Sequence, residues 1–305
     1  MRVFVTGASG YIGSTVAKAF RAKGHMVYGL VRTAESSNQL SLNEIWPIIG
    51  DMNNPDSYKA ALEDVEVVVH CALEASEKSI ELDAKTIDTV LGVFSKSNLP
   101  RAFIYTSGVW VYGSTNDKIV DESSPLNPPD IVKWRPRHEE KVLNATTANL
   151  RTVIMRPGVV YGKVGGLMNI LFDSARDGTV NIIGQGSNRW AMIHIQDLAY
   201  AYVAAAEKEL TRTVLNVADD SHFTVREMAE AIAKSAGIEG NVNELSIEDA
   251  RKQHGDLIQG LALNQQVNNA RIKRLLGWQI HHFPFIEEVD LYYNAWSASN
   301  QNQVF

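Results

Sequence analysis

Short runs of apolar, largely β-branched residues alternate with amphipathic stretches through the first half of the chain. Each such run, bounded by polar or turn residues, predicts a strand. These strands are Arg2–Thr6, Met26–Val31, Trp46–Ile49, Val65–Cys71, Arg101–Ser107 and Arg151–Arg156. Helices are predicted between them over Ile12–Lys23, Pro55–Leu62, Ile80–Ser97 and Arg137–Ala148. Because the strands are apolar along their whole length, the alternation predicts an α/β fold with a doubly wound parallel sheet covered on both faces.

The pattern loosens after residue 157. Helices are predicted over Leu167–Arg176, Ile195–Glu207, Val225–Ser235 and Phe285–Trp296, with one short strand at Val214–Val217. We therefore expect residues 1–157 to form the sheet domain. Residues 158–305 are expected to form a smaller, mostly helical lobe, with segments that return to the first domain. The polar segment Ser297–Phe305 is expected to fray.

One connection, Gly113–Arg137, is predicted to be a long loop. It contains Pro125, Pro128, Pro129 and Pro136 and few apolar residues. Long loops within compact domains are often functional. This one follows a strand that should end where ligands bind, although solvent-exposed padding is the plainer interpretation.

The composition excludes several classes of protein. The 305 residues carry 29 Lys and Arg against 35 Asp and Glu, a net charge of −6, so a nucleic-acid partner is not expected. No apolar run approaches the roughly 20 residues needed to cross a bilayer, and the N-terminus has no signal-peptide pattern, so no membrane association is expected. The single cysteine, Cys71, fits a reducing compartment, and a cytoplasmic protein is predicted.

The strongest local signal is the glycine pattern that opens the chain. The strand Arg2–Thr6 runs into Gly7-Ala8-Ser9-Gly10-Tyr11-Ile12-Gly13, and a helix follows at once. Glycines at this spacing give a tight turn, close backbone approach to a pyrophosphate and close packing of helix on strand. The anion then lies at a helix N-terminus, where free N–H groups face it. This position in an alternating β/α series predicts a Rossmann-type dinucleotide site.

The end of the second strand indicates which dinucleotide. It reads Tyr28-Gly29-Leu30-Val31-Arg32-Thr33 and lacks the acidic residue that takes the ribose hydroxyls of NAD. A guanidinium at Arg32 can instead hold a 2′-phosphate through paired charged hydrogen bonds. NADP(H) is therefore favoured over NAD(H).

The sequence resembles, nearly from end to end, the extended short-chain dehydrogenase/reductase superfamily, which includes the nucleotide-sugar epimerases and dehydratases. The segments that carry the resemblance are Thr6–Gly13, Gly50-Asp51, His70-Cys71-Ala72, Tyr105–Gly108 with Val111-Tyr112-Gly113, Arg156–Gly162, Ile193–Ala199 and Leu276-Gly277-Trp278. Together they are specific for fold and cofactor and say little about substrate.

The resemblance implies a set of cofactor contacts. They are Gly7, Ser9, Gly10, Tyr11, Ile12, Gly13, Arg32, Asp51, Met52, Cys71, Ala72, Leu73, Thr106, Ser107, Pro157, Val159 and Val160. It also implies a small-molecule substrate held between domain and lobe, with Arg156, Trp190 and His194 outlining the crevice. A homodimer through the helices Ile80–Ser97 and Arg137–Ala148 is implied as well. The helix Ile80–Ser97 has an apolar stripe that would suit this interface or core packing equally well, formed by Ile80, Ala84, Ile87, Leu91 and Phe94.

The family's Tyr and Lys, four residues apart on a helix, are missing. The region Pro128–Lys141 contains no Tyr. Aligning Glu140–Leu143 on the family's helix puts Val132 and Pro136 at the two positions, whereas aligning on aromatic character puts Trp134 and His138 there. Neither alignment restores the phenol. The usual catalytic Ser position falls on Gly108, with Ser107 one residue early.

Other groups are therefore candidates for proton transfer. His138 is one, because imidazole titrates near neutrality, and Tyr112 and Tyr161 are others. Ser107 could hydrogen-bond a carbonyl oxygen. Lys133, Arg135 and Arg137 could hold an anionic substrate such as a phosphorylated or nucleotide sugar, or could form a solvated face. Pro136 suits the first turn of a helix, so His138 is expected near a helix start, where the dipole disfavours a cation.

Two functions remain open. The first is an NADP(H)-dependent oxidoreductase or epimerase-like enzyme, with Ser107, His138 and Tyr161 as the catalytic candidates. The second is a catalytically silent NADP(H)-binding sensor or scaffold, which the missing Tyr and Lys favour. No His, Cys or Asp cluster has the sequence spacing of a metal site, since His281 and His282 are adjacent.

Overall fold

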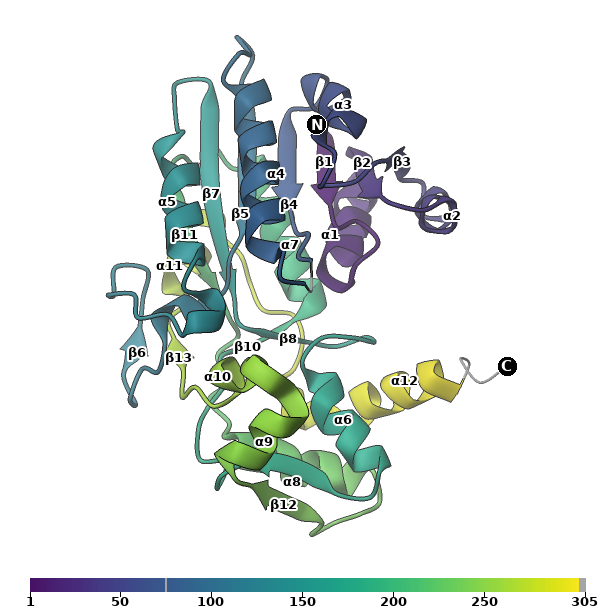
Figure 1. Cartoon of the computed structure of the whole chain (residues 1–305), viewed down its shortest axis with the longest axis vertical. Coiled ribbons are helices and arrows are strands. Elements are labelled where there is room, and N and C mark those ends of the chain that lie inside the picture. The colour runs from purple at the N-terminus through teal and green to yellow at the C-terminus, as the bar shows by residue number, and fades with distance from the viewer. Residues whose placement is uncertain (75, 302–305) are drawn as a thin grey trace.

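The computed structural model describes residues 1–74 and 76–301, and its centre is one seven-stranded sheet. The spatial order is β11-β7-β5-β4-β1-β2-β3, and every neighbouring pair is parallel (Figure 1). The strands are β1 (Arg2–Thr6), β2 (Met26–Val31), β3 (Trp46–Ile49), β4 (Val67–His70), β5 (Arg101–Thr106), β7 (Leu150–Pro157) and β11 (Thr213–Val217). The predicted α/β fold with a doubly wound parallel sheet is confirmed.

Helices cover both faces of the sheet. One face carries α1 (Tyr11–Ala22), α7 (Ile195–Glu207) and α11 (Ala270–Leu276), and the other carries α3 (Lys59–Glu63), α4 (Ser79–Phe94) and α5 (Arg135–Asn144). The short helix α2 (Ala34–Leu42) packs beside β3. Successive side chains of β1 alternate between the two cores: Val3 and Val5 join the first and Phe4 the second, all with no exposed surface. A central parallel strand is thus apolar on both faces.

Segments from the second half of the chain complete the sheet domain. The strand β11 pairs in parallel with β7, and α7 packs against α1. The motif residue Trp278, just after α11, donates a hydrogen bond of 2.9 Å from Nε1 to the carbonyl oxygen of Asp197 on α7. The chain therefore crosses between sheet and lobe several times.

The lobe has its own apolar core, separate from the two sheet cores (Figure 1). Its helices are α6 (Met168–Arg176), α8 (Val225–Ser235), α9 (Ile247–His254), α10 (Ile258–Leu261) and α12 (Val289–Gln301), and its parallel strand pair is β9 (Val180–Ile183) with β12 (Val242–Leu245). A second parallel pair, β8 (Val159–Tyr161) with β10 (Met192–His194), joins lobe and sheet. The segment Ser297–Phe305 was predicted to fray. Its residues 297–301 belong to α12, and its residues 302–305 lie outside the described part of the chain.

The predicted loop Gly113–Arg137 is largely irregular but is anchored at several points. A two-residue strand, β6 (Ile119–Val120), pairs with β13 (Gln266–Val267), and Asp130–Val132 form a single 3₁₀ turn. The backbone N–H of Thr115 donates to the Asn264 carbonyl at 2.7 Å. Helix α5 begins at Arg135, with Pro136 in its first turn as predicted.

The apolar stripe of α4 bears on the predicted homodimer. Of the apolar stripe on α4, Ile87 and Phe94 are buried in the chain's own core, whereas Ile80 is 48% exposed, so most of the stripe serves internal packing. Homodimer formation stays a prediction. Among the described residues, none of the helices combines the length and apolarity required to cross a membrane.

Candidate functional site

The glycine turn lies at the carboxyl end of β1, in the middle of the sheet. Gly7 has a φ of +68°, and the Gly10 N–H donates to the Gly7 carbonyl at 2.8 Å, which closes the turn. A Cβ added to Gly13 would lie 2.2 Å from that same carbonyl oxygen. A Cβ on Gly7 would lie 2.8 Å from the Ala72 Cα. The glycines therefore bring the turn after β1 into direct backbone contact with α1 on one side and with the segment after β4 on the other.

The start of α1 is open to an anion. Among the described residues no side chain caps this helix and no acid lies in its first turn. Ser9 and Gly10 are exposed, and Tyr11 and Ile12 are half-buried. The first N–H groups of a helix lack intrahelical acceptors and carry the positive end of the dipole. The turn therefore has the donors and the backbone cradle that a pyrophosphate requires.

Arg32 lies at the tip of β2, with its side chain 65% exposed. Its Nη1 is 3.1 Å from an Oε2 of Glu74, which follows β4. The neighbouring predicted contacts surround the same end of the sheet: Asp51 accepts from the Asn53 N–H at 2.7 Å, and Leu73 is 60% exposed. Met52 packs against the core formed with α3 and α4. The Arg32 guanidinium can bind another anion only when Glu74 releases it.

The ends of β4 and β5 bring together Cys71, Thr106 and Ser107. The Thr106 hydroxyl is 2.7 Å from the Tyr202 hydroxyl and donates to the Cys71 sulfur at 3.6 Å. Burial raises the pKa of Cys71 to about 12, so its thiol stays protonated. The Ser107 side chain is 6% exposed, and its Oγ has no hydrogen-bond partner among the described residues. A buried, unsatisfied hydroxyl at a sheet edge is a group that a ligand would satisfy.

His138 lies in the first turns of α5 and is 7% exposed. Its Nδ1 is 2.6 Å from Oδ2 of Asp83 on α4, and its ring packs edge-on against Trp134. Three residues earlier on the same helix face, Arg135 donates to the Thr106 carbonyl at 3.1 Å. Thus α5 brings His138 to the same end of β5 as Ser107. Asp83 gives it an anionic partner that no sequence pattern predicts.

The hydroxyls of the two candidate tyrosines, Tyr161 and Tyr112, already contact other buried groups of the protein. Tyr161 has no exposed surface, and its hydroxyl is 3.2 Å from Asp219 and 3.1 Å from the Phe283 carbonyl. Tyr112 donates to Asn216 at 2.8 Å and accepts from Arg156. Burial raises the pKa of both phenols, although Arg156 partly opposes the effect at Tyr112. A proton-transfer phenol needs the opposite shift.

The candidate anion holders differ in their surroundings. Arg135 lies over the Trp134 ring, 4.5 Å from its centroid. Lys133 pairs with Asp130 at 3.3 Å on the surface, and Arg137 is exposed. Arg156 is buried against Glu139, so it supports α5 on β7 instead of facing a ligand. These four cations therefore do not form one basic patch.

The segment after β7 folds back over the glycine turn. The backbone N–H of Val159 is already used by the Ala191 carbonyl at 2.7 Å, and Pro157 and Val160 are buried. The following loop, 162–166, covers the first residue of α1: a Cβ on Gly165 would lie 2.7 Å from the Tyr11 ring. Lys163 in this loop reaches the Thr15 hydroxyl at 3.4 Å. Lys163 is a candidate phosphate contact that was not predicted from the sequence, where its only signal is the glycine-rich loop around it.

Two residues expected to outline the crevice lie near the lobe boundary. Trp190 is buried, and its Nε1 donates to the Leu261 carbonyl at 3.0 Å. His194 stacks on His282 with 3.5 Å between ring centroids, and its Nδ1 accepts from the Gln196 N–H. With Asp197 these two histidines form a group whose ligand atoms lie within 4.8 Å of one another. Because Nδ1 of His194 already caps α7, the geometry fits helix capping better than metal ligation.

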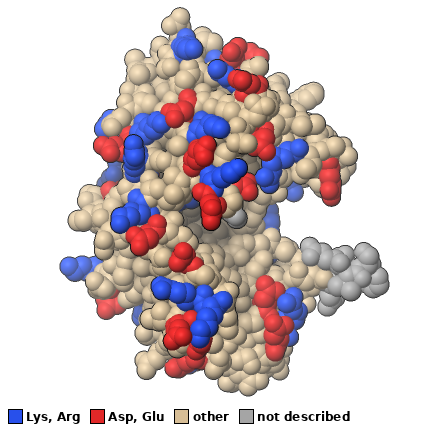
Figure 2. Space-filling view, viewed as in Figure 1, with Lys and Arg blue, Asp and Glu red and all other residues tan. Residues whose placement is uncertain are grey.

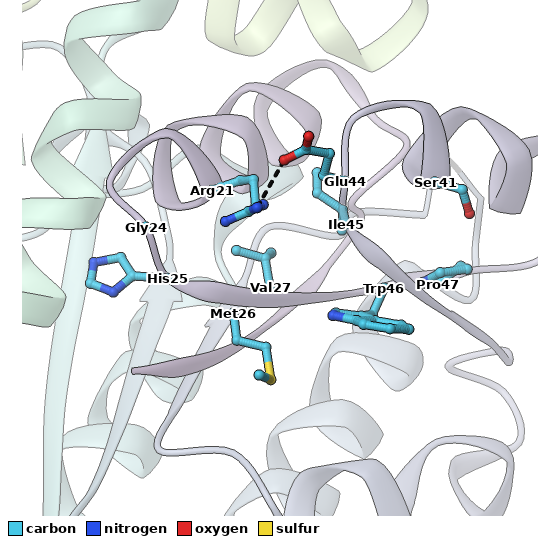
Figure 3. A pocket seen from close by; sticks show the side chains of 10 residues that line it. All are labelled: Arg21, Gly24, His25, Met26, Val27, Ser41, Glu44, Ile45, Trp46 and Pro47. Atoms are coloured by element: carbon cyan, nitrogen blue, oxygen red, sulfur yellow. Dashed lines mark hydrogen bonds and ion pairs between the residues drawn. The ribbon is translucent and has the colours of Figure 1, made fainter.

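Two hollows are visible on the molecule. Figure 2 shows one between sheet domain and lobe, with charges of both signs around it. A separate cavity of about 460 Å³ lies at the opposite ends of β2 and β3, beside Arg21, Met26 and Trp46 (Figure 3). In parallel α/β sheets ligands bind at the carboxyl ends of the strands. Because the glycine turn, Ser107 and His138 all lie at that end, we place the candidate site there and not in the cavity of Figure 3.

The parallel sheet and the glycine turn at its carboxyl edge define a Rossmann-type α/β protein. A family model described as "NAD dependent epimerase/dehydratase family" matches residues 3–218, and the chain belongs to this family. It is 29% identical over 289 residues to the uncharacterized protein C2A9.02 of Schizosaccharomyces pombe, covering 92% of this chain and 96% of that one.

Two solved structures illustrate the likeness in fold. The dTDP-glucose 4,6-dehydratase of Bacillus anthracis, in complex with NAD, has a TM-score of 0.83 at 17% identity and covers 99% of this chain and 98% of its own. The human epimerase family protein SDR39U1, with NADPH, has a TM-score of 0.79 at 23% identity and covers 96% of this chain and 99% of its own.

Proposed function

We propose that this protein is an NADP(H)-dependent oxidoreductase that acts on a carbonyl or hydroxyl group of a small molecule such as a sugar or nucleotide sugar. His138 takes the place of the family's phenol in proton transfer, and Ser107 binds the reacting oxygen. The observation that carries the proposal is the shared location of three features at one edge of the sheet: the open glycine turn, the unpartnered Ser107 hydroxyl and the His138–Asp83 pair.

The cofactor half of the proposal rests on the fit of the turn to a dinucleotide. A Cβ on Gly7 or Gly13 would overlap backbone atoms, so the tight turn needs glycine there, and the first N–H groups of α1 suit a pyrophosphate. Arg32 supports the phosphorylated form because a guanidinium, and not an acid, lies at the tip of β2. Relatives of the same fold hold NAD or NADPH. Gly7, Ser9, Gly10, Tyr11, Ile12 and Gly13 would hold the phosphates, and Arg32 the 2′-phosphate.

A bound nicotinamide supplies or accepts a hydride, so the protein must manage the accompanying proton. In the oxidation direction the substrate hydroxyl gives its proton to Nε2 of His138. In the reduction direction that proton returns to the carbonyl oxygen. The Ser107 hydroxyl donates a hydrogen bond to the same oxygen. General acid–base catalysis of this kind contributes about 10²- to 10⁴-fold. Tyr161 is left out of this scheme because its hydroxyl is buried against Asp219 and Phe283.

The second candidate is an NADP(H)-binding sensor or scaffold that turns over no substrate. Trp134 favours it, because this half-buried side chain lies at one of the two positions aligned with the missing phenol, with Arg135 across its ring. The two candidates agree on cofactor binding and differ only in turnover.

Cofactor binding is tested first, by following nicotinamide fluorescence on titration with NADPH and with NADH. NADPH is expected to bind at least about tenfold more tightly, since one charged hydrogen-bonded group is worth roughly 1.4 kcal/mol or more. Gly13→Ala is the negative control, because its Cβ would overlap the Gly7 carbonyl. Equal, weak binding of both cofactors would contradict the Arg32 assignment.

Turnover is tested next with a panel of aldehydes, ketones and nucleotide sugars at saturating NADPH. His138→Asn keeps a donor near Asp83 but removes Nε2, and it should lower kcat about 10²-fold or more. An unchanged rate in this variant would remove His138 from the mechanism. Tight NADPH binding without turnover on any compound would favour the sensor.

We also propose a cytoplasmic location and, through α4 and α5, a homodimer. The location is supported by the single cysteine with its buried, protonated thiol, which fits a reducing compartment. Light scattering at micromolar concentration would test the dimer.

A further inference from the structure

A string of buried polar side chains runs beneath the carboxyl edge of the sheet and ends at His138. It begins at the Ala72 N–H, which donates to the Thr6 hydroxyl at 3.3 Å. Thr6 Oγ1 is 2.6 Å from Nδ1 of His70, and Nε2 of His70 is 3.2 Å from Oδ1 of Asp83. All four side chains from Thr6 to His138 are at most 7% exposed. Such an interior string is retained only where its groups satisfy one another.

Asp83 is the acceptor on which this string converges. Its Oδ2 accepts from the Tyr105 hydroxyl at 2.8 Å and is 2.6 Å from Nδ1 of His138, while its Oδ1 faces His70. Burial disfavours the charged carboxyl, but the hydrogen bonds from the two histidines, together with electrostatic attraction from His70 and Arg135, outweigh it, and the pKa of Asp83 is lowered. An ionised carboxylate only accepts hydrogen bonds. Both imidazoles must therefore donate to it.

This requirement fixes the chemistry of the His138 ring. Nδ1 carries a proton whenever the ring contacts Asp83, because only then can it donate. Nε2 makes no hydrogen bond within the described part of the chain. It is therefore the nitrogen at which His138 can gain or lose a proton without breaking its contact with Asp83.

We propose that Asp83 is a positioning residue that holds His138 in the Nδ1–H tautomer and aims Nε2 at the substrate oxygen. The inference rests on the proposed role of His138 and adds a residue to it. Asp83 touches neither substrate nor cofactor in this scheme. Its action is to fix which ring nitrogen exchanges the proton and to stabilise the imidazolium formed when Nε2 is protonated, as the buried aspartate of a serine-protease triad does.

The test uses the ring-nitrogen NMR signals of the cofactor-free protein at neutral pH, with His138→Asn to assign the His138 pair. In the wild type, Nδ1 of His138 is expected to carry the proton and Nε2 to lack it or to exchange it. In Asp83→Asn a single amide oxygen must replace two carboxylate oxygens that serve three donors, so the Nε2–H tautomer of His138 becomes populated. Asp88→Asn is the matched control.

Asp88 lies on the same helix and pairs with Lys141 of α5 at 2.5 Å on the surface, so this control removes the same charge between the same two helices. Its His138 signals should match the wild type. Tyr105→Phe removes only one competing donor and should also keep the Nδ1–H tautomer. A wild-type ring protonated on Nε2 alone overturns the proposal, even if Asp83→Asn does not fold. The proposal is also overturned if the His138 ring-nitrogen signals of Asp83→Asn match those of Asp88→Asn.

Activity separates this inference from the proposed function. With a substrate in hand, Asp83→Asn should lower kcat by about 10²-fold or more with little change in KM, whereas Asp88→Asn keeps the wild-type rate. If no compound is turned over, the proposed function fails while the tautomer measurement still decides the role of Asp83. If His138→Asn keeps full activity but Asp83→Asn shifts the tautomer, Asp83 positions His138 without serving catalysis, and the catalytic part of the proposal is overturned.

Discussion

The hydroxyl of Tyr11 donates a hydrogen bond to the carbonyl oxygen of Gly162, and the two oxygens are 2.7 Å apart. Tyr11 is the first residue of α1, and Gly162 follows β8, the strand that joins sheet and lobe. The Tyr11 ring also lies under Gly165 and Gly166, where any Cβ would come within 2.8 Å of it. One side chain therefore holds the loop 162–166 over the anion-binding turn.

Tyr11→Phe should loosen that loop while leaving the fold intact. A lost hydrogen bond of this kind costs about 1 kcal/mol, and we expect NADPH affinity to fall by roughly three- to tenfold. Fluorescence titration measures it. Tyr28→Phe is the control and should bind like the wild type, because within the described part of the chain the Tyr28 hydroxyl hydrogen-bonds to Met26 Sδ alone. Equal affinities in the two variants would mean that the Tyr11–Gly162 bond does not shape the cofactor site.

Arg32 and Glu74 lead to a paired prediction about cofactor choice. Their exposed ion pair competes with a 2′-phosphate for the same guanidinium. Arg32→Gln should weaken NADPH binding by about tenfold and leave NADH binding nearly unchanged. Glu74→Gln should strengthen NADPH binding by roughly two- to threefold, since exposed pairs are worth up to about 1 kcal/mol. Weaker binding of both NADPH and NADH by Arg32→Gln would instead indicate that the Arg32 guanidinium stacks on the adenine.

The sequence predicted the parts of the site that local pattern determines. The strand Arg2–Thr6 and the turn after it are specified within thirteen residues, because apolar alternation and glycine spacing act over short distances. The short strands β8, β10 and β12 were missed. Each has only three or four residues and depends on a partner that is distant in sequence for its hydrogen bonds.

The surroundings of the site were harder to predict for a related reason. Asp83 and His138 are 55 positions apart and meet only because α4 and α5 pack side by side on one face of the sheet. A lone Asp in an amphipathic helix reads as a solvent-facing residue, and nothing nearby in the sequence marks it as buried. Likewise, Tyr161 is a plausible crevice residue by motif, and only the folded lobe reveals its contacts with Asp219 and Phe283.

The buried ion pair of Arg156 and Glu139 carries a prediction about stability. Both side chains are at most 5% exposed, and Nε of Arg156 is 3.0 Å from Oε1 of Glu139. Glu139→Gln leaves a buried guanidinium without its anion and should cost about 3–5 kcal/mol of unfolding free energy. Lys252→Met, in a surface pair with Glu248, should cost less than about 1 kcal/mol. Urea unfolding measures both; similar losses would mean that the buried pair is well solvated.

The stacked rings of His194 and His282 predict how stability responds to acid. Burial, together with the neighbouring His282 ring, lowers the pKa of His194 from 6.5 to about 4. In the unfolded chain His194 therefore takes up a proton at a higher pH than in the native protein. Native stability is unaffected by His194 above about pH 6.5, falls as the pH drops towards about 4, and changes no further below that.

His194→Asn should flatten this fall. The Asn side chain can still cap α7 by accepting from the Gln196 N–H, as Nδ1 of His194 does at 3.2 Å, but it does not titrate. We expect the wild type to lose about 2 kcal/mol of unfolding free energy between pH 6.5 and pH 4 beyond what the variant loses. The variant itself should be less stable at pH 7, because it lacks the stacked ring. Urea unfolding at half-unit pH steps measures both slopes, and parallel slopes would show that His194 is not held neutral in the native protein.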